Sequence, residues 1–274
     1  MTTSRKVSVC IPVHNGERYL RETIDSVTRQ TAVDLEIIVG DDLSADSSLG
    51  IAEDCAAEHP QHQWKILKSD IRLGMAGNWN ACLQASTGEF IKVMGQDDLL
   101  YPGALAAQSK VLSSNPDVVL VVCGCDIISS GGKKIFKRPR KRGSGVYPGK
   151  ELADDCLWKR ANLIGEPVTV MARRSDFISL GGFSSAHRYY IDLEMWLRLL
   201  GIGDCAVLDD PQCGFRIHGK SVSSSTQTED FNQFDDLPGA REHLASLTPA
   251  ARMIRLAKAG ISTRFRSAIY RIYG

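Results

Sequence analysis

The chain has 274 residues and a mass of 30.0 kDa, and its 33 Lys and Arg residues nearly balance its 32 Asp and Glu residues. This formal net charge of +1 excludes the strong positive field of a general nucleic-acid binder, so we expect no nucleic-acid partner. Hydrophobic residues make up 43% and charged residues 24%, which is typical of an ordered globular protein. The length suits one large domain, or one domain with a small appendage.

Two features of the sequence predict a cytoplasmic protein. No apolar run reaches the roughly 18 residues of a membrane span, and Met1–Lys6 leads into an apolar stretch without a cleavage site of small residues. The eight cysteines lie apart except for Cys123 and Cys125, which a strand would place on one face, and no second pair accompanies them. We therefore expect buried, reduced thiols rather than disulfides or a zinc site.

The first half of the chain alternates between short apolar runs and amphipathic stretches. Strands are predicted at Val7–Ile11, Leu35–Val39, Trp64–Leu67, Phe90–Met94 and Val118–Val122. Helices are predicted between them, at 17–30, up to Glu58, at 77–85 and after Pro102. This alternation predicts βαβ units and therefore an α/β fold with a mostly parallel, Rossmann-like sheet flanked by helices.

Polar clusters follow three of these strands, at Pro12–Asn15, Asp41–Asp42 and Asp97–Asp98. We expect all three at the carboxyl edge of the sheet, where folds of this class bind ligands. Two adjacent carboxylates repel each other, and a divalent cation or ribose hydroxyls would offset that repulsion. Either acidic pair alone could reflect only the preference of turns for Asp, but their combination favours a functional site.

After residue 123 the pattern becomes less regular. Gly131 and Gly132 predict a hairpin turn, and seven of the ten residues in Lys133–Arg142 are basic. Helices are predicted near 149–160, 174–180 and 192–200, with short strands near 168–171 and 214–217.

A series of short motifs resembles the family 2 glycosyltransferases of GT-A fold. The motifs are Val7–Leu20, Ser26–Thr31, Glu36–Ser44, Thr87–Phe90 and Gln96–Leu99. The resemblance is close over about residues 5–115 and weaker to about residue 218. It implies an inverting, metal-dependent enzyme of the hexosyltransferase type that uses a nucleotide-diphosphate sugar with Mn²⁺ or Mg²⁺. It also implies a glycosyltransferase domain at 1–220, with a nucleotide-binding half at about 5–123 and an acceptor-side half at about 124–220.

The same resemblance implies roles for individual residues. Asp42 would accept a hydrogen bond from the base, which favours UDP- or dTDP-sugars, and His14 would stack on that base. Asp97 would face the ribose, while Asp98 and His218 would hold the metal at the diphosphate. Gly95 replaces the first Asp of the commoner motif, so we expect weak metal binding without the donor. The nucleotide-sugar-binding residues would be Pro12, Val13, His14, Glu17, Asp42, Arg72, Asn78 and Asp97.

Asp192 is the predicted catalytic base, in a segment that resembles the family's Glu-Asp motif with Ile191 in place of Glu. Inverting transfer needs one carboxylate to take the proton of the acceptor hydroxyl. Two alternatives stay open: Asp192 could serve only the dipole of its helix, or Glu194 could be the base. We expect the choice of donor sugar to depend on side chains around Leu163–Pro167 and Arg173–Arg174.

Other activities have weaker support in the sequence. Gly214–Ser221 fits the P-loop pattern, but it lacks a buried strand before it and a helix after it, which argues against an NTPase. No G-x-G-x-x-G motif follows the first strand, which weakens the case for a dinucleotide-dependent oxidoreductase. A nucleotidyltransferase and a non-catalytic nucleotide-sugar-binding module remain the alternative functions.

We therefore expect transfer of a sugar to a hydroxyl of a saccharide or lipid-linked saccharide in polysaccharide or glycolipid assembly. The basic run Lys133–Arg142 is either a solvated hairpin or a binding site for acceptor phosphate. Residues 221–274 are predicted to form a flexible loop and a basic amphipathic helical segment. That segment could associate peripherally with the inner face of a membrane, pack on the core, or join a second subunit in a homo-oligomer.

Overall fold

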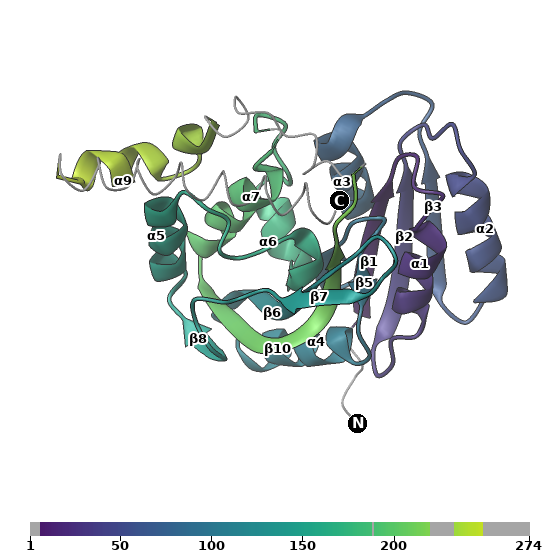
Figure 1. Cartoon of the computed structure of the whole chain (residues 1–274), viewed down its shortest axis with the longest axis horizontal. Coiled ribbons are helices and arrows are strands. Elements are labelled where there is room, and N and C mark those ends of the chain that lie inside the picture. Colours follow the sequence, from purple (N-terminus) through teal and green to yellow (C-terminus); the bar gives the residue numbers. More distant parts are fainter. Residues whose placement is uncertain (1–5, 188, 220–232, 249–274) are drawn as a thin grey trace.

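The computed structural model describes residues 6–187, 189–219 and 233–248. Within these ranges the chain forms one sheet with helices on both faces (Figure 1). The strands are β1 (Lys6–Val13), β2 (Asp34–Asp41), β3 (Gln63–Lys68), β4 (Phe90–Val93), β5 (Leu99–Leu100), β6 (Val118–Ile128), β7 (Lys134–Lys137), β8 (Gly145–Tyr147), β9 (Val170–Arg173) and β10 (Asp204–Arg216). The helices are α1 (Leu20–Thr28), α2 (Ser48–Glu58), α3 (Gly74–Ala85), α4 (Ala104–Ser114), α5 (Gly149–Lys159), α6 (Arg174–Ser179), α7 (Ile191–Leu200) and α9 (Ala240–Ser246), with 3₁₀ turns at Pro167–Thr169 and Gln233–Asp236.

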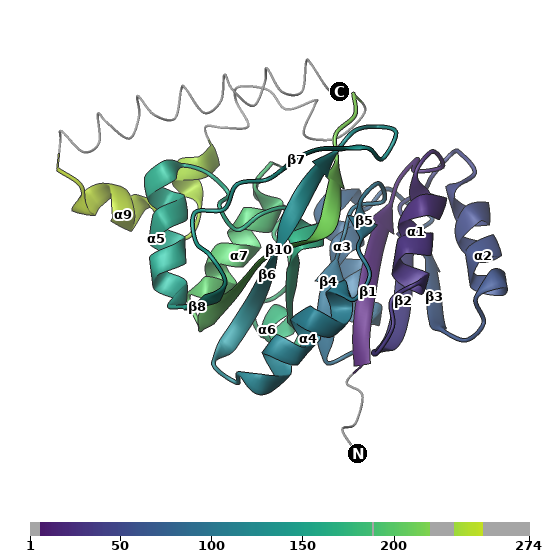
Figure 2. The same ribbon diagram turned by 60° about the horizontal axis from the view of Figure 1, so that its bottom comes forward.

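The sheet has the order β3-β2-β1-β4-β9-β6-β10-β5, with β7 paired to β6 and β8 to β10. The pairings among β1, β2, β3 and β4 are parallel, as is the pairing of β6 with β10. The exception in the middle is β9, which runs antiparallel to both β4 and β6. Strands β5, β7 and β8 also pair antiparallel, so four of the nine strand pairings among the described residues are parallel. The predicted α/β fold with a central sheet flanked by helices is confirmed, with its parallel part at β1–β4, and Figure 2 shows β1, β2 and β3 side by side.

Two hydrophobic cores lie on opposite faces of the sheet. Helices α1, α2 and α4 cover one face, and α3, α5, α6 and α7 cover the other (Figures 1 and 2). The alternation of strand side chains divides the residues between the cores: Ile37 and Val39 of β2 enter the first, and Ile38 enters the second. All positions of β6 are buried, because this strand lies near the centre of the sheet.

The sequence predicted the position of most elements but underestimated the length of two strands, β6 and β10. β6 extends to Ile128, past the predicted boundary between the two halves at residue 123. β10 runs from Asp204 to Arg216, whereas a strand was predicted only near 214–217, because register shifts carry the strand across Asp209–Pro211. The expectation that no buried strand precedes Gly214 is therefore wrong, but Gly214 lies inside β10 rather than at a turn after it, which still argues against a P-loop.

Part of the chain beyond residue 220 belongs to the core. Phe234, Leu237 and Ala240 are buried in the same core as α5 and α7. Of the stretch 221–274, which was predicted to form a flexible loop and a basic helical segment, residues 221–232 and 249–274 lie outside the described residues. Within the described ranges, no helix combines the length and the apolar character needed to cross a bilayer.

All eight cysteines are buried and unbridged, which confirms the prediction of free thiols.

A buried carboxylate joins the amino ends of three parallel strands. Glu36 of β2 is 1% exposed, and its oxygens accept hydrogen bonds from Ser8 of β1, from Thr87 before β4 and from the ammonium of Lys6. Burial raises the pKa of Glu36, but hydrogen bonds from Ser8, Thr87 and Lys65 outweigh it and lower the pKa to about 2.

We expect Glu36→Gln to lower the free energy of unfolding by about 2–3 kcal/mol at pH 7, because the ionised carboxylate is favoured in the folded state. That contribution is complete above the ordinary Glu pKa and is lost as the pH falls towards 2, so the difference from wild type should shrink below about pH 4.5. Urea unfolding across this range measures it. Glu58→Gln, at an exposed ion pair with Arg21, is the matched control and should have a far smaller effect; equal effects of the two variants would contradict the assignment.

Candidate functional site

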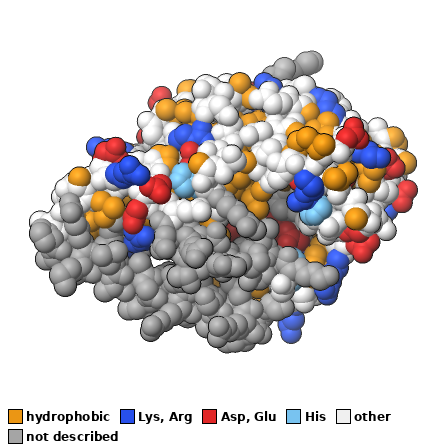
Figure 3. Space-filling view, turned by 90° about the horizontal axis from the view of Figure 1, so that it is seen from above, with side chains coloured by type: hydrophobic (Ala, Val, Ile, Leu, Met, Phe, Trp, Pro, Cys, Tyr) orange, Lys and Arg blue, Asp and Glu red, His pale blue; other side chains and the backbone are white. Residues whose placement is uncertain are grey.

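The three polar loops predicted at the carboxyl edge do meet there. Past Pro12 at the end of β1, the backbone N–H of His14 donates to Oε1 of Gln96 (2.8 Å), and Nε2 of Gln96 donates back to the carbonyl of His14 (3.2 Å). Nδ1 of the same histidine lies 3.0 Å from the carbonyl of Asp42, after β2. Gln96 thus fixes the acidic loop (residues 94–98, between β4 and β5) against the loop after β1. Figure 3 views the molecule from this side and shows a hollow in which acidic side chains lie near basic and histidine side chains.

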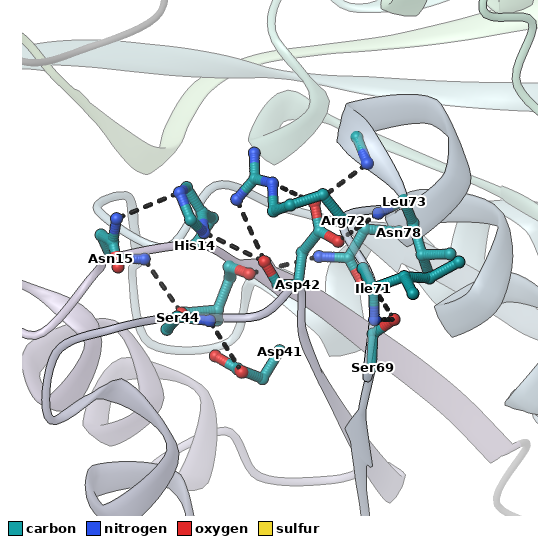
Figure 4. A network of polar contacts seen from close by, with 12 residues as sticks. His14, Asn15, Asp41, Asp42, Ser44, Ser69, Ile71, Arg72, Leu73 and Asn78 are labelled. Carbon is teal, nitrogen blue, oxygen red and sulfur yellow. Dashed lines mark hydrogen bonds and ion pairs between the residues drawn. The ribbon is translucent and has the colours of Figure 1, made fainter.

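Asp42 caps the start of α3 and is almost fully buried (Figure 4). Its carboxylate accepts the backbone N–H of Leu73 (2.6 Å) and of Gly74 (3.0 Å). The guanidinium of Arg72 donates to the carbonyl of Asp42 (3.0 Å) and remains about half exposed. An acidic side chain at a helix N-terminus satisfies unpaired amides and is stabilised by the helix dipole. Asp42 therefore holds the segment before α3 against the end of β2, and its contact with a base stays a prediction.

Three further predicted donor-binding residues have structural partners. The amide of Asn78 is buried and donates to the carbonyls of Gly40 (2.8 Å) and Val13 (3.3 Å), which ties α3 to β2 and β1. The side chain of Val13 is 1% exposed and belongs to the core. Glu17 accepts the backbone N–H of Ser47 at the start of α2 (3.1 Å). These contacts shape the loops around the hollow, and direct contact of these residues with a donor stays a prediction.

The acidic loop after β4 is packed tightly against the end of β10. Oδ2 of Asp97 lies 2.7 Å from Nε2 of His218, and Oδ1 of Asp98 accepts the backbone N–H of Arg216 (3.1 Å). Burial, followed by the neighbouring charge of Asp97, holds the pKa of the Asp98 carboxyl well above its usual value. A Cβ atom at Gly95 would lie 2.7 Å from a carboxylate oxygen of Asp97 and 3.0 Å from one of Asp98. Glycine at the first motif position therefore leaves room for both carboxylates.

The side chains of this loop are of the chemical type that binds divalent cations, but they do not form a complete site by themselves. Two carboxylates and an imidazole are oxygen and nitrogen donors of the required type, and a cation would relieve the unfavourable charge at Asp98. Across the described residues, no group of three or more His, Cys, Asp or Glu side chains is placed so that it could hold a metal ion. Mg²⁺ commonly binds one or two carboxylates and substrate phosphates rather than such a cage. The roles of Asp98 and His218 as ligands therefore stay a prediction, in which phosphate would have to supply further ligands.

The side chain of Arg216 is hydrogen-bonded to the acidic loop and holds it in place. Its guanidinium is 1% exposed and lies 4.7 Å from the centre of the Tyr19 ring. Nε donates to the carbonyl of Asp97 (2.7 Å), and the terminal nitrogens donate to Glu22 (2.7 Å) and to the carbonyl of Ser130 (3.1 Å). The guanidinium is thus enclosed by protein partners and connects α1, the acidic loop and the hairpin between β6 and β7. The sequence alone could not distinguish this role from direct contact with a diphosphate.

Asp192 lies in the first turn of α7 and is partly exposed. Its carboxylate accepts the side-chain amide of Asn162 (2.8 Å) and the backbone N–H of Leu193 (2.7 Å). Burial of the carboxylate outweighs these bonds and the charge of Arg138, and raises the pKa of Asp192 to about 6. Such a group accepts a proton readily near neutral pH. Sequence reasoning missed Asn162, since nothing nearby in the sequence marks it as a partner of Asp192.

The alternative base, Glu194, is already engaged. It is buried and forms an ion pair with Arg198 one turn later on α7 (2.7 Å). This pairing leaves Asp192 as the better placed carboxylate for proton transfer.

Asp98 and Asp192 are both connected to the carboxyl end of β6. Asp98 binds Arg216, whose register partner in β6 is Ile128. On the side of Asp192, Asn162 accepts a bond from Arg138 through its carbonyl, and the backbone N–H of Arg138 donates to the carbonyl of Cys125. Cys125 and Ile128 are three residues apart, which corresponds to about 10 Å along a strand. The two carboxylates are therefore attached to the same end of the sheet.

The two segments expected to select the donor sugar lie at different places. Leu163–Pro167 directly follows Asn162, whose amide also donates to the carbonyl of Gly165 (3.0 Å), so this segment adjoins Asp192. Arg173 pairs with Phe90 at the amino end of β4, and Arg174 binds the backbone of Glu89. The prediction for Arg173–Arg174 is wrong, because β9 runs antiparallel and carries these side chains to the opposite edge of the sheet.

The basic run Lys133–Arg142 is largely neutralised by carboxylates. Lys134 pairs with Asp126 (2.9 Å) and Lys137 with Asp209 (3.1 Å), while Arg138, Lys141 and Arg142 pair with Glu166, Asp155 and Asp155, respectively. The guanidinium of Arg140 donates to the carbonyl of Cys123. These contacts favour a structural hairpin over a site for acceptor phosphate, which stays a prediction.

We expect Gly95→Ala to weaken Mn²⁺-dependent binding of a nucleotide sugar about tenfold, because the added methyl group must displace Asp97 from His218. Calorimetric titration of the donor measures this effect, and the melting temperature reports on the fold. Gly50→Ala, in α2 with open space around its Cβ, is the control and should bind as wild type does. Unchanged donor affinity in Gly95→Ala would contradict this account of the acidic loop.

Comparison with known proteins identifies the family. Residues 8–181 match the sequence profile of glycosyl transferase family 2. An uncharacterised protein of Mycobacterium tuberculosis is 32% identical over 203 residues, which are 71% of this chain and 61% of that protein.

Among solved structures, Staphylococcus aureus TarS 1–349 in complex with UDP-GlcNAc has a TM-score of 0.69 at 19% identity, over 93% of this chain and 71% of that one. The mannosyltransferase PcManGT of Pyrobaculum calidifontis, in complex with GDP-Man and Mn²⁺, has a TM-score of 0.61 at 18% identity, over 99% and 85%. The structural matches support the GT-A fold, and because the profile covers more than half of the sequence, the chain belongs to glycosyl transferase family 2.

Proposed function

We propose that this protein is an inverting glycosyltransferase that moves a sugar from a nucleotide-diphosphate donor to a hydroxyl of a saccharide or lipid-linked saccharide. The observation that carries the proposal is the attachment of two carboxylates, Asp98 in the acidic loop and Asp192 on α7, to the same end of the sheet. One is suited to bind a cation and the other to accept a proton. Membership of the family supports glycosyl transfer as the reaction.

The donor is proposed to lie against the loops after β1, β2 and β4. His14 would stack on the base and Asp42 would accept its imide proton, which favours UDP- or dTDP-sugars. Complexes of structural neighbours with UDP-GlcNAc and GDP-Man support a nucleotide-sugar donor in general. Arg72 is exposed beside Asp42 and would contact the nucleotide, and Asp97 would contact the ribose.

Asp98, with His218, would hold Mn²⁺ or Mg²⁺ at the diphosphate. Such a cation, when bound, stabilises the negative charge of the departing nucleoside diphosphate. The neighbour with GDP-Man and Mn²⁺ supports metal use in general. Arg216 would keep the acidic loop in place through its bond to the carbonyl of Asp97.

The proposed reaction is a single displacement at the anomeric carbon. Asp192 removes the proton of the acceptor hydroxyl while the oxygen forms a bond to that carbon. The bond from the same carbon to the diphosphate oxygen breaks, and the nucleoside diphosphate leaves with the electron pair, so that the configuration is inverted. General base catalysis of this kind contributes typically about 10²–10⁴ in rate. Asn162 orients the carboxylate of Asp192 for this step.

The setting we propose is cytoplasmic assembly of a polysaccharide or glycolipid. A lipid-linked acceptor would place the protein at the inner face of a membrane, and the basic residues at 250–272 could provide the contact.

A thermal-shift screen of nucleotide sugars, with and without Mn²⁺ or Mg²⁺, tests the proposal first. One UDP- or dTDP-sugar should raise the melting temperature more in the presence of the cation. That donor should then be turned over with saccharide acceptors, with release of nucleoside diphosphate. Release of pyrophosphate from a nucleoside triphosphate and a sugar phosphate would instead identify a nucleotidyltransferase, and protection without turnover on any acceptor would indicate a binding module.

Substitutions of the two carboxylates should impair different steps, donor binding for Asp98 and transfer for Asp192. Asp98→Ala should abolish cation-dependent donor binding, because the proposed metal loses its buried ligand. Asp192→Asn should bind the donor as wild type does but transfer about 10²–10⁴-fold more slowly, because an amide cannot take the proton. Calorimetry for binding and product release for turnover separate these effects. Wild-type transfer by either variant would overturn the assignment of that residue.

We expect the transfer rate at saturating substrates to rise from acid to neutral pH with a midpoint near 6, because Asp192 must be ionised to act as base and burial raises its pKa. The charge of Arg138 lowers that pKa, so Arg138→Gln should move the midpoint to higher pH. Rates measured in single turnovers from pH 5 to 8 provide the test. A wild-type profile that stays flat across this range would count against Asp192 as the base.

A further inference from the structure

A side chain of α3 is hydrogen-bonded to the loop that precedes α7, across 103 positions of the sequence. Nδ2 of Asn80 donates to the carbonyl of Phe183 (2.8 Å), and Oδ1 of Asn80 accepts the backbone N–H of the same residue (2.8 Å). Both hydrogen-bonding groups of one amide are thus used on both backbone groups of one residue. This two-point contact fixes the orientation of the loop as well as its distance from α3.

The loop is shaped to receive this amide. Gly181 and Gly182 have φ values of +80° and +75°, a left-handed conformation that favours glycine. A Cβ atom at Gly182 would lie 2.4 Å from Oδ1 of Asn80, so a larger residue would block the contact. The Phe183 ring next to this turn packs edge-on against Trp79 of α3, with 4.9 Å between the ring centres. The two glycines, the amide of Asn80 and the Phe183 ring therefore all contribute to the contact between this turn and α3.

The opposite side of this turn is held by the helix that carries Asp192. The guanidinium of Arg198 on α7 donates to the carbonyl of Gly182 (2.6 Å) and to that of Leu180. Arg198 is itself fixed by its ion pair with Glu194 on the same helix. The turn at 180–183 is therefore bound by α3 on one side and by α7 on the other. Through these bonds, the position of α3 constrains the position of α7.

Helix α3 is also the helix that organises the proposed donor site. Asp42 binds the amides at its start, and Asn78, two residues before Asn80, binds the carbonyls that end β1 and β2. A continuous series of short polar contacts therefore runs from Asp42 through α3, Asn80, the turn and Arg198 to α7. The side chains of Asn80 and Arg198 are themselves engaged by protein partners.

We propose that Asn80 is a positioning residue for glycosyl transfer: it sets the place of the catalytic-base helix α7 relative to the donor-binding loops, through the turn at 180–183 and Arg198. This inference rests on the proposed role of Asp192 as base. Misplacement of a catalytic group by as little as 1 Å can cost about 10²-fold in rate, so a contact outside the site can control turnover.

The test uses Asn80→Asp, which keeps the size of the side chain and one oxygen that can accept the Phe183 N–H, but replaces the donating NH₂ group with an oxygen facing the Phe183 carbonyl. We expect kcat to fall about tenfold or more while the Kd for the donor changes less than twofold. Arg198→Lys should give the same pattern from the other side of the turn. Asn115→Asp, where the amide binds only the carbonyl of Val111 near the amino edge, is the matched control and should leave kcat unchanged.

A second comparison distinguishes positioning from a general loss of structure. If Asn80 acts through Asp192, the residual rate of Asp192→Asn should fall no further when Asn80→Asp is added. An unchanged kcat in folded Asn80→Asp and Arg198→Lys, or donor Kd values that rise as much as kcat falls, would overturn the inference. Full activity of Asp192→Asn would instead refute the proposed base, whatever the Asn80 variants do.

Discussion

The buried guanidinium of Arg216 is the contact on which the acidic edge of the sheet depends. Adjacent carboxylates at the end of a strand repel each other, and burial makes the charge of Asp98 still less favourable. Arg216 offsets this through its backbone bond to Asp98 and its side-chain bond to the carbonyl of Asp97, while Glu22 and the Tyr19 ring enclose its own charge. The fold thus holds two neighbouring carboxylates at the carboxyl edge of the sheet through contacts with the end of β10.

Helix α3 has an analogous organising role on the nucleotide side. Its start is capped by a carboxylate from the end of β2, its first turns bind the carbonyls of β1 and β2, and its middle is attached to the turn before α7. One rigid helix therefore has fixed contacts with the donor-binding loops and with the helix of Asp192. In a reaction that joins a donor to an acceptor, the relative placement of these parts governs the rate.

Several parts of the site could be predicted because they are local. The loops after β1, β2 and β4 follow from the βαβ pattern, and their meeting follows from parallel strands that end at a common edge. Gln96 was overlooked although it lies inside a recognised motif, because its partner is the backbone of His14, 82 positions earlier. Asn162 and Asn80 were overlooked for the same reason, since each acts on a residue that only folding brings close.

The sequence by itself determined the α/β class, the order of the elements and the family, because periodic burial and short motifs are properties of neighbouring residues. Only the tertiary structure decided what each polar side chain binds. It assigned Arg216 to the support of the acidic loop, paired the cations of Lys133–Arg142 with carboxylates, and carried Arg173 and Arg174 to the far edge on an antiparallel strand. The physical reason is that hydrogen bonds and ion pairs depend on distance in space, and strand direction and register set that distance for residues far apart in the chain.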